Sequence, residues 1–145
     1  MKLALVFPGQ GSQAVGMLQS FAECKPVREV FAEAADILHQ DLWQLAKDGP
    51  ADELNSTVNT QPLMLTAGYA AYRAWRDAGG APPAVVAGHS LGEYTALVVA
   101  GVVSLRDALP LVRFRAQAMQ EAVPVGTGAM AAILGLDDDA VRAAC

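Results

Sequence analysis

Two short apolar runs, at residues 3–7 and 84–87, interrupt a chain whose hydrophobic positions otherwise recur at helical spacing. Both runs are continuous in apolar residues, as the buried strands of a parallel sheet are. Between them, residues 27–40 carry an apolar stripe that predicts an amphipathic helix. Thr60 is the predicted cap of a longer helix, which we expect to bury Trp75.

Shorter segments complete the predicted order of elements. Helices or helical turns are expected over residues 17–25, 41–47, 51–54, 91–100 and 105–122. Ser104 opens the last of these with a capping-box pattern, because Asp107 follows three positions later. Residues 129–134 predict a new strand, and Asp137 is the predicted N-cap of a further helix. This alternation favours an α/β fold, a parallel sheet flanked by helices.

The composition bounds the class of protein. With 145 residues, 53% of them hydrophobic, the chain is long enough for one core and too short for two ordinary domains. A formal net charge of −5 argues against nucleic acid as a partner. No apolar run approaches the ~18 residues of a membrane span. The two cysteines, Cys24 and Cys145, lack the spacing of a zinc site or a disulfide framework, so we expect no metal and a reducing, cytoplasmic location.

Ser90 is the leading candidate for a nucleophile. It stands in Gly88-His89-Ser90-Leu91-Gly92, directly after an apolar run and before a helical stretch. That is the layout of a nucleophile elbow, whose glycines are needed because Cβ atoms would clash in so sharp a turn. The following helix would direct backbone N–H groups and its positive dipole end at an oxyanion. Such five-residue patterns also arise by chance, but the strand-turn-helix context favours acyl transfer.

The glycine-rich loop after the first strand partly matches two nucleotide-binding motifs, and the sequence argues against both. Residues 9–14 match a permissive dinucleotide fingerprint, but no second strand ending in an acidic residue follows ~20 positions later. Residues 11–16 have phosphate-loop spacing, but Met17 stands where the lysine is required. A tight loop at this strand end can instead present a backbone N–H beside the serine, because the strand ends of a parallel sheet meet at one edge.

Three separated segments give the chain a specific resemblance. Residues 7–13 (FPGQGSQ), 88–93 (GHSLGE) and 119–124 (MQEAVP), in this order, resemble the malonyl-CoA:acyl carrier protein transacylase family. The resemblance runs from Lys2 onward and corresponds to about the first half of such an enzyme. It implies a hydrolase-like α/β domain over residues 1–125 and, over residues 126–145, the start of an inserted ferredoxin-like subdomain.

The resemblance also implies a mechanism and its partners. Ser90 would attack the malonyl thioester, and the backbone N–H groups of Gln10 and Leu91 would hold the oxyanion. Coenzyme A would leave, and the phosphopantetheine thiol of acyl carrier protein would take the malonyl group, in fatty acid biosynthesis. Malonyl-CoA is then a substrate, and no bound cofactor is implied. The family's catalytic histidine would lie beyond Cys145.

Three arginines on the predicted helix 105–122 differ in their neighbours. At 3.6 residues per turn, Arg106 and Arg113 share a polar face with Gln117, which predicts solvated side chains. Arg115 has apolar neighbours instead, so its guanidinium either extends along an apolar surface to water or enters a pocket. The resemblance places Arg115 where the family binds the malonyl carboxylate.

Neither histidine is expected to be the base that Ser90 needs. His89 flanks the elbow and is expected to point away from Ser90, and His39 ends a helix. Two alternatives stay open beside the transferase. A serine thioesterase or patatin-like lipase would use the same elbow, and a fragment without the base would bind coenzyme A or carrier protein without turnover. Arg115 and the loop at residues 9–13 favour the transferase.

Overall fold

A computed structural model describes residues 2–123, 126–128 and 133–144, and it joins one small parallel sheet to a group of helices. Strands β1 (Ala4–Phe7) and β2 (Val85–Gly88) pair in parallel, with Phe7 opposite Gly88 at their carboxyl ends. The helical elements are η1 (Gln19–Phe21), α1 (Lys25–Leu38), α2 (Leu42–Asp48), α3 (Ala51–Asn55), α4 (Thr57–Asp77), α5 (Leu91–Val99), α6 (Leu105–Ala122) and α7 (Asp138–Ala144). The structure thus confirms a mixed α/β fold with a parallel sheet.

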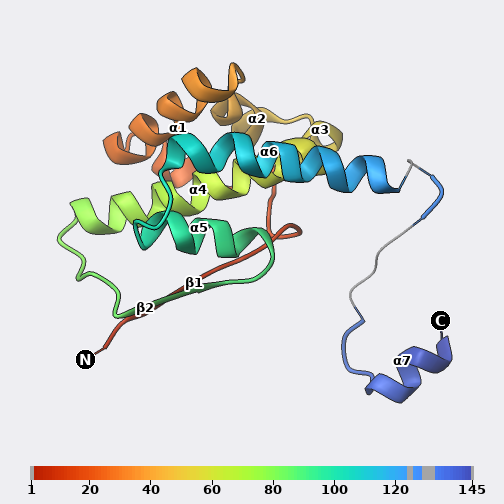
Figure 1. Ribbon diagram of the computed structural model, residues 1–145. Helices are drawn as coiled ribbons and strands as arrows, with labels where there is room; N and C mark the ends of the chain where they lie inside the picture. Colours follow the sequence, from red (N-terminus) through yellow and green to blue (C-terminus); the bar gives the residue numbers. More distant parts are fainter. Residues whose placement is uncertain (1, 124–125, 129–132, 145) are drawn as a thin grey trace.

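Helix α4 lies at the centre of the core, in contact with α1, α5 and α6 (Figure 1). Leu63 and Leu65 of α4, Val30 of α1, and Leu109 and Val112 of α6 are buried together. Each such side chain contributes about 1.5–3 kcal/mol when it is fully buried. The apolar residues whose helical spacing predicted amphipathic helices are therefore the residues that form the core.

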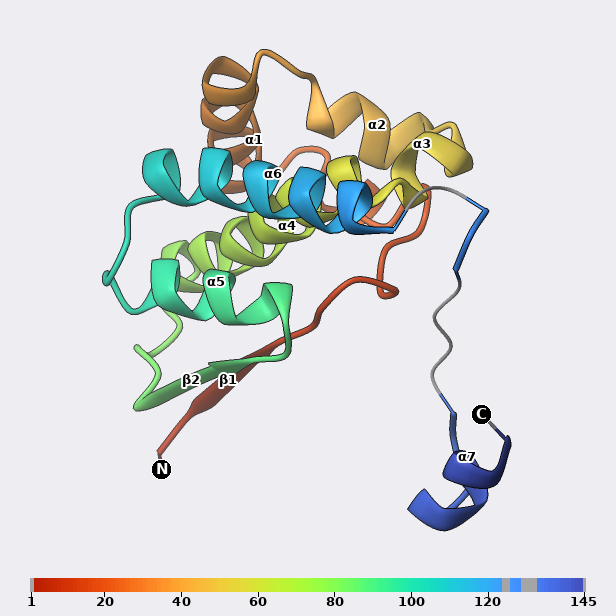
Figure 2. The ribbon, with the colours of Figure 1, turned by 45° about the vertical axis from the view of Figure 1, so that its right-hand side comes forward.

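The sheet has one covered and one open face in the described part of the chain. Helix α5 packs on the sheet, and helices α1–α4 and α6 lie beyond it on the same side (Figure 2). Phe7 faces this helical layer and is buried, whereas Val6 and Val85 are 74% and 61% exposed. Helix α7 lies apart from the other helices in both views. None of the helices in the described residues is long and apolar enough to span a membrane.

Several predicted boundaries are confirmed and others are wrong. Ser104 caps α6 by accepting a hydrogen bond from the Asp107 amide at 3.1 Å, and Asp137 accepts one from the Ala140 amide at 2.8 Å ahead of α7. The helix predicted over residues 17–25 is only the short η1. The predicted strand at 129–134 falls largely outside the described residues.

The two expectations about the long helix are wrong. Helix α4 begins at Thr57, and Thr60 is a buried residue of its first turn whose hydroxyl donates to the Leu54 carbonyl at 2.5 Å. Trp75 is 46% exposed, because the last turns of α4 extend past the helices that cover its middle. Its indole N–H donates to the Ala81 carbonyl at 3.0 Å, so the ring packs on the following loop.

Candidate active site

Ser90 stands at a strained turn between β2 and α5. Its backbone has φ 52° and ψ −113°, in the left-handed half of conformational space that non-glycine residues rarely adopt. Such conformations cost about 1–3 kcal/mol and persist where the surrounding structure holds them. The side chain is exposed at the turn, as expected of a nucleophile elbow.

The glycines on either side of Ser90 are required by close backbone contacts. A Cβ on Gly88 would lie 2.0 Å from the carbonyl of Gly92, and a Cβ on Gly92 would lie 2.1 Å from the Phe7 oxygen. Both are far inside van der Waals contact, and neither obstacle is a side chain that could move. The steric reason for this glycine spacing is thus present in the fold.

One cavity collects the predicted site residues from separate parts of the sequence. Gln10 follows β1, Ser90 and Leu91 form the elbow, and Arg115 is on α6. All four line a cavity of ≈730 Å³. The cavity is also lined by residues that the sequence reasoning missed, among them Asn55, Gln61 and Met119.

Arg115 enters this cavity instead of extending to water. Its Nη2 donates to the Ser90 Oγ at 3.1 Å, and its Nη1 donates to the Gln61 Oε1 at 2.5 Å. The guanidinium also lies 5.6 Å from the centre of the Tyr94 ring. No Asp or Glu of the described residues is within ion-pair distance of it. The arrangement therefore presents an unneutralised cation beside the serine.

Two backbone amides at the cavity have no hydrogen-bond partner in the described part of the chain. Neither the Gln10 N–H nor the Leu91 N–H donates a hydrogen bond to another described residue. Leu91 is the first residue of α5, where the helix leaves its N–H groups free and places the positive end of its dipole. Gln10 is also tied to α4, because its Oε1 accepts a hydrogen bond from the Thr57 hydroxyl at 2.7 Å.

Comparison with known proteins identifies the family. The model of the acyl transferase domain matches residues 4–145. The chain belongs to the acyl transferase domain family. It is 59% identical over 145 residues to the malonyl CoA-acyl carrier protein transacylase of Escherichia coli (strain K12), covering 99% of this chain and 47% of that protein.

Solved structures agree with this assignment. The acyl-carrier-protein S-malonyltransferase from Burkholderia pseudomallei 1710b superposes with a TM-score of 0.92 at 73% identity, covering 99% of this chain and 47% of that one. A malonyl-transacylase in complex with its type II PKS acyl-carrier protein gives a TM-score of 0.92 at 51% identity, covering 100% and 47%. This acyltransferase chain spans about half the length of the relatives it matches.

The prediction for Arg113, on the same helix of this acyltransferase chain, is wrong. Its side chain is half-buried where α6 packs on α1 and α4, and its Nη2 donates to the Gln40 Oε1. Burial lowers the pKa of the guanidinium, and its Nε is buried without a partner in the described structure. A polar helical face is therefore covered here by neighbouring helices.

No base contacts the Ser90 hydroxyl in the described residues. His89 lines the same cavity, but the hydrogen bond made by the Ser90 Oγ is with Arg115. His39 is exposed at the end of α1 with φ 52°. The Ser90 hydroxyl proton therefore has no acceptor among the described groups.

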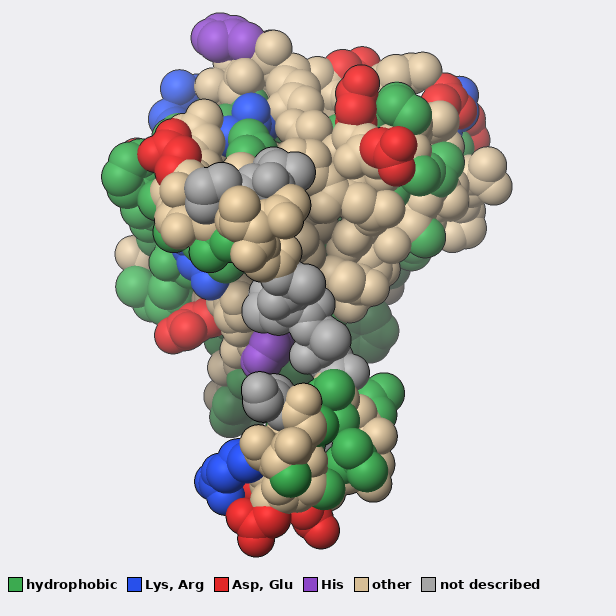
Figure 3. All heavy atoms as spheres, turned by 90° about the vertical axis from the view of Figure 1, so that its right-hand side faces the viewer, with side chains coloured by type: hydrophobic (Ala, Val, Ile, Leu, Met, Phe, Trp, Pro, Cys, Tyr) green, Lys and Arg blue, Asp and Glu red, His purple; other side chains and the backbone are tan. Residues whose placement is uncertain are grey.

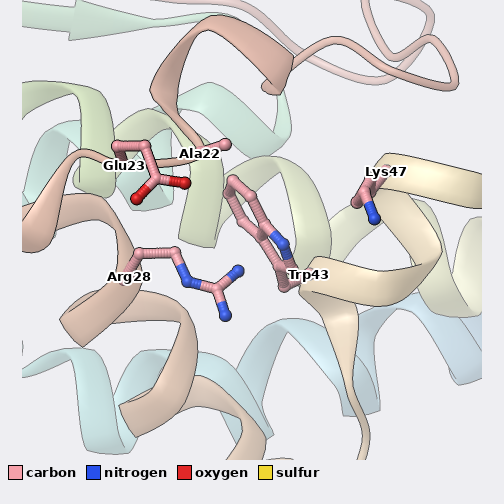
Figure 4. Close-up of a pocket in the computed structure, with 5 residues that line it drawn as sticks. All are labelled: Ala22, Glu23, Arg28, Trp43 and Lys47. Atoms are coloured by element: carbon pink, nitrogen blue, oxygen red, sulfur yellow. The ribbon is translucent and has the colours of Figure 1, made fainter.

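A second cavity lies between η1, α1 and α2. It has a volume of ≈550 Å³ and is lined by Ala22, Glu23, Arg28, Trp43 and Lys47 (Figure 4). The Arg28 guanidinium lies 4.4 Å from the centre of the Trp43 ring. Two carboxylates match its two cations in number, since Glu23 lines the cavity and Asp48 lies 3.6 Å from the Lys47 Nζ, so this cavity lacks the unneutralised charge found at Arg115. Elsewhere too, on the face in Figure 3, basic and acidic side chains are interspersed.

Proposed function

We propose that the protein carrying this chain transfers malonyl from coenzyme A to the phosphopantetheine thiol of acyl carrier protein, through an ester on Ser90, in fatty acid biosynthesis. The observation that carries the proposal is the Arg115 guanidinium, 3.1 Å from the Ser90 hydroxyl and unpaired with any described carboxylate. The names of the relatives support the same substrate and acceptor.

The reaction proceeds as two acyl transfers through one oxygen. The Ser90 Oγ loses its proton to a base and attacks the thioester carbonyl, and the tetrahedral oxyanion accepts hydrogen bonds from the Gln10 and Leu91 amides. Collapse breaks the C–S bond, and coenzyme A leaves as its thiol with the proton from the base. The carrier thiol then attacks the serine ester and returns the proton to Ser90. Each oxyanion donor contributes about 2.7–4 kcal/mol in comparable sites.

Arg115 supplies the selection for malonyl over acetyl. In malonyl one methylene separates the reacting carbonyl from the free carboxylate. A malonyl carbonyl held at Ser90 therefore places that carboxylate close to the Arg115 guanidinium, which contacts Ser90. A guanidinium forms paired hydrogen bonds with a carboxylate, and an acetyl group offers it no partner.

The family resemblance supplies the base and the division into domains. The base is a histidine beyond Cys145, and residues 126–145 begin a ferredoxin-like subdomain inserted into a hydrolase-like domain over residues 1–125. Malonyl-CoA enters as substrate, and the chemistry uses no bound cofactor. The cytoplasmic location expected from the sequence stays a prediction.

The test is covalent labelling of the complete protein with malonyl-CoA. Mass spectrometry should find one malonyl group on the peptide that carries Ser90, and holo acyl carrier protein should remove it. Ser90→Ala should take no label, whereas Ser104→Ala, a serine outside the cavity, should still be labelled at Ser90. Label on Cys24, unchanged transfer by Ser90→Ala, or rapid release of free malonate to water would contradict the proposal.

A further inference from the structure

The cavity contains a buried amide that the proposed mechanism does not use. Gln61 lies on α4 next to Arg115 and is 1% exposed. A buried amide must satisfy both its oxygen and its NH₂ group within the protein, since water does not reach it. The hydrogen bonds of the Gln61 amide therefore show which side chains fix its position and which side chain it positions.

Every polar atom of Gln61 has a partner with a definite direction. Its Oε1 accepts from the Arg115 Nη1 at 2.5 Å, and its Nε2 donates to the Thr57 Oγ1 at 3.0 Å and contacts the Met119 Sδ at 3.4 Å. The Thr57 hydroxyl in turn donates to the Gln10 Oε1 at 2.7 Å. Because a guanidinium only donates, Arg115 fixes which way the amide faces, and the amide fixes the hydroxyl.

Helix geometry gives this arrangement its rigidity. Thr57 and Gln61 are four residues apart on α4, and Arg115 and Met119 are four residues apart on α6, so each pair is on one helical face. The two helices pack against each other, which sets the two pairs side by side. Gln61 of the packed helix α4 thereby holds the Nη1 of Arg115, while the Nη2 faces Ser90.

We propose that Gln61 is a positioning residue that holds the Arg115 guanidinium in the orientation that receives the acyl carboxylate, and that Thr57 links this orientation to the Gln10 loop. The inference rests on the proposed function. Gln61 is well suited to the role because it is neutral: it accepts a hydrogen bond from Arg115 without neutralising it, and the full positive charge stays available to the substrate. A carboxylate in this position would form the ion pair that the substrate must form.

The test compares variants of the complete protein for Ser90 acylation by malonyl-CoA and by acetyl-CoA. Gln61→Glu keeps the side-chain shape and places a carboxylate on Arg115, and Gln61→Leu removes the hydrogen bonds to Arg115 and Thr57. Each should lower the malonyl-to-acetyl ratio of kcat/KM by about 100-fold, the loss typical of a misplaced binding group. Gln61→Glu should act mainly by raising KM for malonyl-CoA. Thr57→Ser should keep the ratio, whereas Thr57→Val, which lacks the hydroxyl, should lower it.

The matched control is a second Gln–Arg pair between the same helix and another part of the molecule. Gln40 accepts from Arg113 of α6 and does not line the cavity. Gln40→Leu should lower the free energy of unfolding and leave the malonyl-to-acetyl ratio unchanged.

Three results would overturn the positioning role. They are a ratio within about twofold of wild type in both folded Gln61 variants, an equal loss of malonyl and acetyl acylation, and a fall in the ratio for Gln40→Leu as large as for Gln61→Leu. Urea unfolding of each variant identifies those that are folded. The proposed function fails by a different result, the absence of any malonyl on Ser90 in the wild-type protein.

Discussion

Arg115→Met removes the cation from the cavity while keeping most of the side-chain volume. The guanidinium would meet a malonyl carboxylate at about 4 Å, where opposite unit charges attract by about 4 kcal/mol at an effective dielectric constant of about 20. Arg115 is only half-buried, so solvent screening reduces this value, and we expect a loss of about 2–3 kcal/mol. That corresponds to an about 30- to 160-fold lower kcat/KM for malonyl transfer.

Acetyl transfer should change much less, because acetyl has no carboxylate to lose its partner. It loses only the hydrogen bond from Arg115 to Ser90, for which we expect less than a tenfold change. The assay is acylation of Ser90 from each thioester, measured as kcat/KM on the complete protein. Arg113→Met is the matched control, since it makes the same change two positions along α6 at a residue that does not line the cavity.

Two results would refute this reasoning. An equal loss of malonyl and acetyl transfer in Arg115→Met would show that the arginine supports the structure of the elbow and not the selection of the acyl group. A malonyl-specific loss in Arg113→Met would show that the effect comes from charge on α6 in general.

Gly92→Ala should lower the free energy of unfolding by more than about 3 kcal/mol in urea titrations and abolish Ser90 labelling, since its Cβ would lie 2.1 Å from the Phe7 oxygen. Gly68→Ala should cost less, about 0–2 kcal/mol, because its Cβ meets the methyl of the buried Thr95 at 2.9 Å and helix propensity offsets part of the resulting strain. Equal effects of the two substitutions would contradict the steric argument. The 145-residue chain expressed alone should bind hydrophobic dyes through surfaces such as the open sheet face. It should also transfer malonyl poorly, because the described residues place no base against Ser90. Cooperative unfolding together with full activity would contradict this.

The elbow could be predicted from sequence because several local signals coincide there. A continuous apolar run, glycines two positions either side of Ser90 and a helical stretch together leave few alternatives, and the structure has β2, the strained turn and α5 in those places. The cap at Ser104 was predictable for the same reason, since its partner is three residues away. Signals that lie within one turn of chain are visible without the fold.

The contacts that sequence reasoning missed are long-range. Gln61 resembles any polar residue near a helix start, and its partner Arg115 is 54 positions away. The helical wheel placed Arg113 on a polar face, but it could not show that α1 and α4 cover that face, with Gln40 at a separation of 73 positions. A helical wheel sorts side chains by direction, and only the packing of other helices decides which directions are buried.

The register between β1 and β2 sets the distance between two parts of the site. Phe7 lies opposite Gly88, and the next amide, of His89, donates to the Phe7 carbonyl at 3.2 Å, so the Gln10 loop and the Ser90 turn leave the sheet at one level. The spacing between the loop amide and the nucleophile is thus set by the strand ladder. One residue inserted within either strand would reverse the direction of its side chains and separate the two halves of the site, although every residue of the site would still be present.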